Sequence, residues 1–268
     1  MIIAALIVIV VLAMVLFLFF KIIDVLYLNT FKRPLFVHFY LKKRTLKPNR
    51  KLILVQQFSF YKKLSRKHRS YFEHRVACFI DDKEFIGRDG SFVDDEKKVL
   101  IAATAVMLTF GMRNYLLDVV EKIIIYPDVF YSTINKANHK GEFNPMVKAL
   151  VFSWKDFKEG YAIEDDNLNL GIHEFTHAIH LNSLKSGDTA SIIFSDGFKE
   201  LQEILKLRNV RDKMIESDYF RDYAFTNQFE FLAVVVENFI ESPKDFKVYF
   251  PEIYYKLRQM FNFRFAGY

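Results

Sequence analysis

The segment Asn169-Leu-Gly-Ile-His-Glu-Phe-Thr-His-Ala-Ile-His180 contains two histidines, His173 and His177, four residues apart. On an α-helix, this spacing places the two imidazoles about 40° apart around the axis and one turn apart along it, so both can reach one zinc ion at about 2.0–2.1 Å. Glu174 then projects beside the ion, where it can accept a proton from a zinc-bound water. Because the rest of the segment is mostly apolar, these polar groups would be costly without partners. The segment therefore predicts a helix with a zinc site on one face.

His180 is a further histidine of the same segment, but it lies too far along the helix to join the first two. A continuous helix rises about 10 Å between His173 and His180, so three imidazoles cannot meet one ion at about 2.1 Å. Metzincins solve this problem with a glycine that turns the chain before a third histidine. Here His180 occupies the glycine position and Ser183 the ligand position, which excludes a metzincin. We expect His180 to be a structural histidine or to support a ligand.

The third ligand must come from elsewhere, and Glu230 is the strongest candidate. The chain has a single cysteine, so a metal site must use mainly histidine and carboxylate ligands. Glu230 stands in the run Gln228-Phe-Glu-Phe-Leu-Ala-Val-Val-Val236, where a carboxylate needs a compensating partner such as zinc. Glu237, two turns later, shares its face and either orients a ligand or is a solvated acid at a helix end. Two histidines, one glutamate and a water form the open coordination of a hydrolytic zinc site.

Apolar periodicity and turn residues predict an α+β domain that is mostly helical with a small sheet. One or two amphipathic helices are expected between residues 58 and 79. Asp94 and Asp95 are placed to cap a helix that follows them. Strands are expected at 119–126 and 146–154, and helices at 96–110, 165–183, 195–217 and 226–241. The acids Glu164, Asp165 and Asp166 suit the N-terminus of the helix at 165–183, and Pro243 is expected to end the last helix.

Residues 2–20 are nineteen consecutive apolar residues without a charge, glycine or proline. As a helix they extend about 28 Å, which is about the thickness of the hydrocarbon core of a bilayer. A cleaved signal peptide is the alternative, but it has basic residues before a shorter apolar core and small residues at its cleavage site. A core helix that is apolar on every side is rare in a domain of this size. We therefore predict an uncleaved membrane anchor.

The positive charge of the chain is concentrated directly after this apolar run. Residues 21–75 contain fifteen Lys and Arg but only two acids, a net charge of +13, whereas the rest of the chain carries −7. Lys and Arg close to a membrane span stay on the cytoplasmic side, so we expect the body of the protein to face the cytoplasm. Beside a membrane, such a stretch is expected to contact anionic lipid headgroups rather than nucleic acid.

Most of residues 58–262 resemble the Mlc titration factor A family of zinc-dependent peptidases, gluzincin-like enzymes with His-Glu-x-x-His and a distant glutamate. The resemblance is carried by Ile123-Ile-Ile-Tyr-Pro127, Ala149-Leu-Val-Phe-Ser-Trp154, Asn169 to His177, and Tyr223-Ala-Phe-Thr-Asn-Gln-Phe-Glu230. It implies a zincin-like fold and one Zn²⁺ per chain, held by His173, His177 and Glu230. It further implies Glu174 as the catalytic base, Tyr223 as a hydrogen-bond donor to the transition state, and contact with a transcriptional regulator.

Two features depart from the family pattern. His180 replaces the aspartate that follows the second histidine in the family, and the membrane anchor is absent from the soluble prototype. Without the family spacing, Tyr223 would be interpreted as an ordinary half-buried tyrosine.

The chain is predicted to comprise a transmembrane anchor (1–21), a basic juxtamembrane linker (22–54) and a zinc peptidase domain (55–268). The predicted function is a membrane-anchored zinc metallopeptidase of the bacterial inner membrane, with a cytoplasmic catalytic domain, a peptide or protein substrate and no direct nucleic-acid partner. One alternative is a regulator-binding module of the same fold with incidental hydrolysis, and another is a lipid- or nucleic-acid-binding protein with a structural metal. Glu174 favours the enzyme, because a structural site has no use for it.

Overall fold

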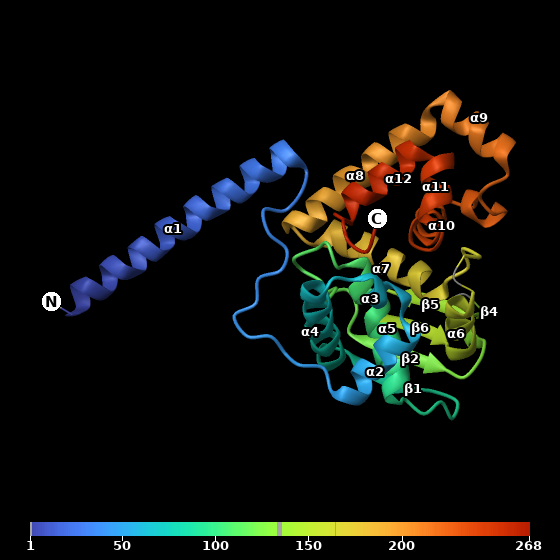
Figure 1. Ribbon diagram of the computed structural model, residues 1–268, viewed down its shortest axis with the longest axis horizontal. Coiled ribbons are helices and arrows are strands. Elements are labelled where there is room, and N and C mark those ends of the chain that lie inside the picture. The colour runs from blue at the N-terminus through green and yellow to red at the C-terminus, as the bar shows by residue number, and fades with distance from the viewer. Residues whose placement is uncertain (1, 133–135, 164) are drawn as a thin grey trace.

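Helix α7 (Leu170–Lys185) carries the two histidines and lies at the centre of the body of the protein (Figure 1). It packs against α10 (Gln228–Glu241), α5 (Asp95–Leu108), α8 (Thr189–Lys206) and strand β5 (Gly141–Asn144). The computed structural model describes residues 2–132, 136–163 and 165–268. The neighbours of α7 come from both sides of it along the sequence, so the site that it carries is assembled from distant segments.

The main sheet has four strands in the order β1-β2-β6-β5. Strands β1 (Glu84–Gly87), β2 (Lys122–Tyr126) and β6 (Ala149–Ser153) run parallel to one another, and β5 pairs antiparallel with β6 at the edge. Every residue of β6 is buried, as expected of a central strand with covered faces. A separate antiparallel pair is formed by β3 (Phe130–Ser132) and β4 (Ala137–His139). The expected strands at 119–126 and 146–154 are confirmed with shorter bounds.

Helices make up most of the described chain, which confirms the predicted α+β, mostly helical fold. One or two helices were expected in the region 58–79, and the structure has two. The elements not yet given are α1 (Ile2–Phe31), α2 (Pro48–Gln57), α3 (Ser59–Lys63), α4 (Arg66–Asp82), α6 (Trp154–Ala162), α9 (Arg208–Ser217), the 3₁₀ helix η1 (Asp222–Phe225), α11 (Pro243–Tyr249) and α12 (Pro251–Met260).

Local capping explains where several helices begin. Asp94 caps α5 by accepting a hydrogen bond from the backbone N–H of Lys97, as predicted. The expected single helix at 195–217 is wrong. Asp188 accepts hydrogen bonds from two backbone N–H groups and starts α8 earlier, and Leu207 is extended between α8 and α9. Helix α10 ends before Pro243, as expected, and Pro243 begins the next helix.

The predicted start of the histidine helix is also wrong. Asn169 caps α7 by accepting a hydrogen bond from the backbone N–H of Ile172, so the helix begins after the acidic residues. Asp165 and Asp166 precede it, and Asp166 accepts from the backbone N–H of Leu168 in the connecting turn. Glu164 lies outside the described residues. The side-chain hydrogen bond of Asn169, and not the acidic residues, therefore sets the start of α7.

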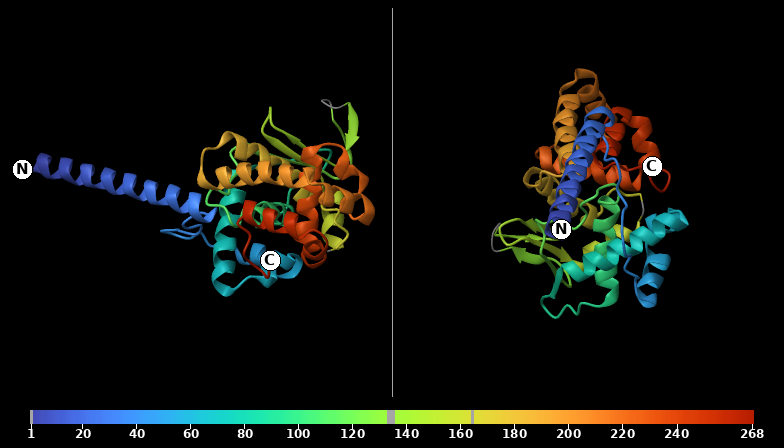
Figure 2. Two further views of the ribbon diagram at one scale, coloured as in Figure 1. Left: turned by 90° about the horizontal axis from the view of Figure 1, so that it is seen from above. Right: turned by 90° about the vertical axis from the view of Figure 1, so that its left-hand side faces the viewer.

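Helix α1 projects away from the body, as Figure 1 and the left view of Figure 2 show. Its apolar residues 2–20 are exposed, and the helix is long and apolar enough to cross a membrane. It continues beyond the apolar run to Phe31, where its last turns approach α8. There Asp24 is buried and accepts two hydrogen bonds from the Arg113 guanidinium, at 2.9 and 3.0 Å, and one from the Thr189 hydroxyl at 3.1 Å. This cluster connects the end of α1 to the body.

Candidate metal centre

Helices α7 and α10 bring His173, His177 and Glu230 together. Nε2 of His173 lies 2.9 Å from Oε2 of Glu230 and 3.1 Å from Nε2 of His177, and Nε2 of His177 lies 3.5 Å from the same carboxylate oxygen. One donor atom from each of the three side chains lies within 4.8 Å of the others. The sequence predicted these residues from two segments more than fifty positions apart, and the structure places them at one point.

The three donor atoms fit a tetrahedral cation. Ligand atoms at about 2.0–2.1 Å from a tetrahedral Zn²⁺ are separated by roughly 3.4 Å, which is close to the separations found here. Two imidazole nitrogens that face each other beside a carboxylate would otherwise have to share protons. Nitrogen and oxygen donors from neutral imidazoles and a carboxylate suit zinc and similar divalent ions. His173, His177 and Glu230 therefore form a site into which such an ion fits.

Glu237 orients His173 from behind. Its Oε1 accepts a hydrogen bond from Nδ1 of His173 at 2.6 Å, which leaves Nε2 facing Glu230 and His177. The Glu237 side chain is 1% exposed, and the Arg221 guanidinium lies 2.7 Å from its Oε2 and 3.1 Å from its Oε1. A carboxylate that binds the far nitrogen of a ligand histidine fixes its tautomer and ring orientation. Of the two interpretations left open for Glu237, the buried, orienting one agrees with these contacts.

Glu174 faces the edge strand β5. The side chain is buried, and burial raises the pKa of its carboxyl group, while His173 and His177 oppose this shift. The backbone of Phe143 hydrogen-bonds to the carboxylate. A Cβ atom at Gly141 would lie 2.9 Å from Oε1 of Glu174, so only glycine lets β5 approach this closely. Gly141 and Phe143 thus place Glu174, and periodicity gave no sign of either.

Tyr223 belongs to η1, on the other side of the histidines. Its ring centroid lies 5.8 Å from that of His173, and its side chain is half exposed. Burial and the neighbouring Glu230 carboxylate raise the pKa of the Tyr223 phenol to about 12, so it remains a hydrogen-bond donor at neutral pH. Tyr223, His173 and Glu174 line one open cleft of about 580 Å³, together with the segment from Asn138 to Gly141. The cleft therefore gives access from solvent to His173 and Glu174.

The hydrogen bonds around the site shift the pKa values of its members. Burial alone would lower the pKa of His173, but its hydrogen bonds to Glu230 and Glu237 outweigh burial and raise the pKa to about 10. Burial would raise the pKa of Glu230, but the two histidines hold it well below its ordinary value. The site therefore binds a proton strongly, and a metal ion that takes its place must release that proton.

His180 lies away from this group. Its ring packs 4.6 Å from the Phe198 ring and 5.1 Å from the Phe229 ring, between centroids, and burial lowers its pKa. His180 was expected either to be a structural histidine or to support a ligand, and these contacts agree with the structural role. The aromatic surroundings favour a neutral imidazole and would disfavour a charged aspartate at this position.

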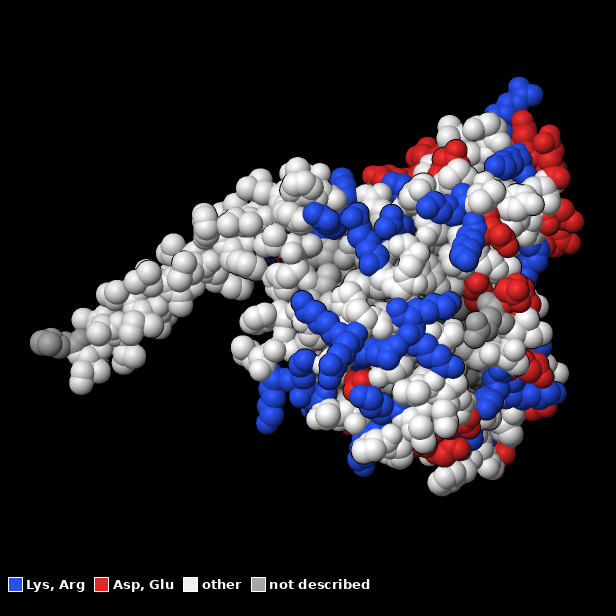
Figure 3. Space-filling view, in the orientation of Figure 1, with Lys and Arg blue, Asp and Glu red and all other residues white. Residues whose placement is uncertain are grey.

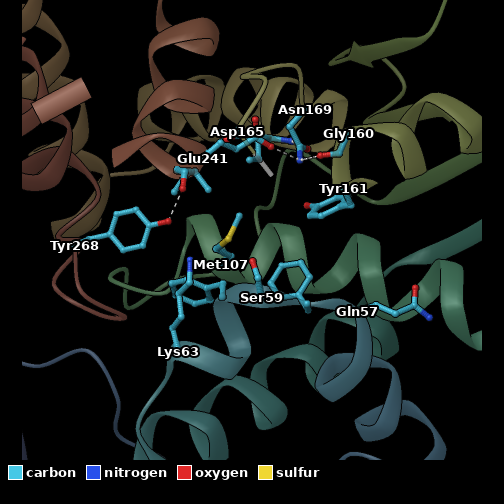
Figure 4. Close-up of a pocket in the computed structure, with 14 residues that line it drawn as sticks. Gln57, Ser59, Lys63, Met107, Gly160, Tyr161, Asp165, Asn169, Glu241 and Tyr268 are labelled. Atoms are coloured by element: carbon cyan, nitrogen blue, oxygen red, sulfur yellow. Dashed lines mark hydrogen bonds between the residues drawn. The ribbon is translucent and has the colours of Figure 1, made fainter. Parts of the chain in front are cut away.

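A second cavity lies behind α7 (Figure 4). On this side the Asn169 amide donates to the Gly160 carbonyl at 2.6 Å and to Oε1 of Glu241 at 2.9 Å, which joins α7 to α6 and α10. Burial and the charge of Glu237 raise the pKa of Glu241 to about 8, although the Asn169 hydrogen bond opposes them. The cavity side of α7 therefore holds the start of the helix in place, while the cleft side carries the donor atoms.

The fold and the site define a class of protein. A helix with His-Glu-x-x-His beside a small sheet, with a carboxylate from a later helix, is the arrangement of a metal-dependent hydrolase. The chain belongs to the family of glucose-regulated metallo-peptidases M90, whose model matches residues 32–262. It is 24% identical over 241 residues to an uncharacterized protein of Synechocystis, an alignment that covers 82% of this chain and 85% of that protein. The family resemblance predicted from the sequence is confirmed, and the family implies a metal and a peptidase.

Proposed function

We propose that this chain is a membrane-anchored, zinc-dependent metallopeptidase that hydrolyses peptide bonds in a peptide or protein substrate. The observation that carries the proposal is the meeting of His173, His177 and Glu230 at one point. His173 also lines an open cleft together with Glu174 and Tyr223. Two imidazole nitrogens and one carboxylate oxygen leave the fourth position of a tetrahedral ion open, as catalytic zinc sites do. The membership of the chain in a metallopeptidase family supports the same assignment.

The chain's own residues can supply each step besides the metal chemistry. Bound Zn²⁺ would polarise the scissile carbonyl and acidify the attacking water. Glu174 accepts the proton that this water loses and passes it to the leaving nitrogen as the carbon–nitrogen bond breaks. Tyr223 donates a hydrogen bond to the oxygen on which negative charge develops. Glu237, held by Arg221, keeps the His173 ring in its ligating orientation.

We further propose that residues 2–20 anchor this peptidase in the bacterial inner membrane with the body in the cytoplasm. The proposal is supported by the exposed apolar helix and by the basic residues that follow it. Protease added to spheroplasts should leave the body intact, and lysis should make it sensitive. Digestion before lysis would place the body outside and point to a substrate in the envelope.

A digest of a peptide library by the full chain in lipid nanodiscs tests the enzymatic proposal. We expect cleavage that a chelator stops and that added Zn²⁺ restores, because the ligand set requires a bound ion. The matched control is Glu174→Gln, which keeps the three proposed ligands. Cleavage that persists equally in the chelated protein and in Glu174→Gln would contradict the proposal and indicate a contaminating peptidase.

A further inference from the structure

We infer that the segment 36–44 is a second membrane contact, in which Phe39 and Leu41 insert among the anionic headgroups of the bilayer that α1 enters. This inference rests on the proposed anchoring through residues 2–20. It adds that the body lies against the lipid surface in a fixed orientation and is not merely connected to the membrane by a flexible linker.

The side chains of this segment alternate between the body and the solvent. His38 and Tyr40 point inward, and the His38 ring stacks 4.8 Å from the Tyr71 ring and lies 4.6 Å from the Phe110 ring. Phe39 and Leu41 point outward and are 69% and 94% exposed. Alternation of this kind is the property of an extended backbone. The chain thus directs two large apolar side chains away from its own core.

The backbone of the segment is held in this orientation. Arg75 on α4 is fully buried, and its guanidinium donates to the Tyr40 hydroxyl and to the Val37 carbonyl. The backbone N–H of Arg44 donates to Nδ1 of His74 at 2.8 Å. Because these contacts lie on both sides of Phe39 and Leu41, the exposed pair has a defined position on the body.

Aromatic contacts place the segment at the level where α1 leaves the apolar run. Phe20 is the last residue of that run, and its ring centroid lies 5.8 Å from that of Phe36. The Phe36 ring centroid in turn lies 6.3 Å from that of Phe39. If residues 2–20 fill the hydrocarbon core, Phe39 lies at its boundary with the headgroups, where aromatic side chains are enriched in membrane proteins.

The contacts between α1 and the body fix the position of the segment relative to the helix. Asp24 accepts hydrogen bonds from Arg113, whose guanidinium also lies 3.9 Å from the centre of the Phe36 ring. Asp24 and Phe36 therefore share one partner, so the helix and the segment are fixed to the same point of the body. A rigid helix that enters the bilayer then carries Phe39 and Leu41 to its surface.

The charge of the surrounding surface suits anionic headgroups. Lys32 and Arg33 precede the segment, and Lys42, Lys43 and Arg44 follow the exposed pair. Lys and Arg side chains gather on the face of the body beside the base of α1 (Figure 3). Apolar side chains flanked by cations are typical of protein surfaces that lie in the interface of anionic membranes.

Tryptophan quenching by brominated lipids tests the inference on the full chain in phosphatidylcholine–phosphatidylglycerol vesicles. The variants are Phe39→Trp and Leu41→Trp, and the unsubstituted chain gives the background of its single tryptophan, Trp154. Ile215→Trp is the matched control, since Ile215 is 74% exposed and lies on α9, at the far end of the body from α1 (Figure 1). Leu12→Trp reports on the anchor, because Leu12 lies in the middle of the apolar run.

We expect strong quenching of Leu12→Trp by lipids brominated deep in the acyl chain. Phe39→Trp and Leu41→Trp should be quenched most by lipids brominated near the headgroup, with a shift of emission to the blue, while Ile215→Trp stays at background. Quenching of the pair should weaken in vesicles of phosphatidylcholine alone. Quenching of Leu12→Trp without any quenching of Phe39→Trp and Leu41→Trp overturns the inference and leaves the anchor intact. Failure of Leu12→Trp as well would overturn the anchoring itself.

Discussion

Helices α1 and α7 are both rich in apolar residues, but their surroundings differ completely. Residues 2–20 of α1 are exposed, whereas residues 171–180 of α7 are buried except for His177, which is half-buried. In α7 the two histidines of the candidate site have partners on α10, since His173 meets Glu230 and Glu237 and His177 meets Glu230. In α1 the buried Asp24 lies beyond the apolar run, where it meets Arg113. The position of the polar residues, more than the apolar content, distinguishes a helix suited to a membrane from a buried helix that carries a metal site.

The comparison would break most clearly if Glu174, the buried base candidate of α7, were unimportant for catalysis. Glu174→Gln is nearly isosteric and should keep fold and metal. Because glutamine cannot transfer a proton, we expect the turnover number to fall by about 10²–10⁴, or more if Glu174 also positions the water. Steady-state kinetics on a peptide found in the library digest measure the effect. Wild-type turnover in this variant would remove Glu174 from the mechanism.

Tyr223→Phe should have the next largest effect. The phenol contributes one hydrogen bond to the developing oxyanion, and the loss of one such donor costs about 10²–10³ in rate. Since the interaction is made in the transition state, kcat should fall with little change in KM. Tyr255→Phe, an exposed tyrosine of α12, is the control. A change in KM alone would make Tyr223 a substrate-binding residue instead.

Glu237→Gln sharpens the comparison because it weakens the hydrogen bond that orients His173 and leaves the three proposed ligands in place. Loss of such a partner typically lowers metal affinity by about 10–100-fold. Competition with a chromogenic chelator measures the zinc affinity, and Glu216→Gln on the exposed side of α9 is the control. Unchanged affinity would reduce Glu237 to a partner of Arg221 alone.

Glu241 gives the smallest effect, on stability. Its pKa is about 8 in the folded chain against an ordinary value of 4.5, so the folded state keeps a proton that the unfolded state loses. The contribution of Glu241 to stability should therefore be constant below pH 4.5 and fall as the pH rises from there to about 8. We expect Glu241→Gln to abolish roughly 2 kcal/mol of this decline, which is less than the full shift implies because the side chain is partly exposed. Thermal unfolding at pH 5 and pH 9 measures it, and equal declines in both proteins would contradict the assignment.

The sequence was sufficient for the fold class because α7, α10 and the central strands have strong patterns. His173, His177 and Glu230 could be predicted because a polar group in an apolar helix needs a partner. The sequence pattern does not give the distance between α7 and α10. Arg221 could not be found in this way, because an arginine in a loop has no periodicity. Gly141 could not be found either, because its role depends on the approach of β5 to Glu174.

The errors have local causes. Residues 195–217 keep helical periodicity across Leu207, so the break between α8 and α9 leaves no mark in the apolar pattern. At α7, both the acidic residues 164–166 and Asn169 are residue types that occur at helix N-termini. The side-chain hydrogen bond of Asn169 shows that the helix begins after Asn169. Short strands such as β1 and β4 contain too few residues for alternation to be recognised.

The zinc content of the purified full chain tests the central claim most directly, namely that α7 and α10 together hold one ion. Elemental analysis should give about one zinc per chain for the wild type and for Glu174→Gln. Glu230→Ala removes the ligand that α10 supplies and should lose most of the zinc, whereas the control Glu216→Ala should not. Undiminished zinc in Glu230→Ala would contradict the account, since the ion would then be held without the helix that is proposed to complete its site.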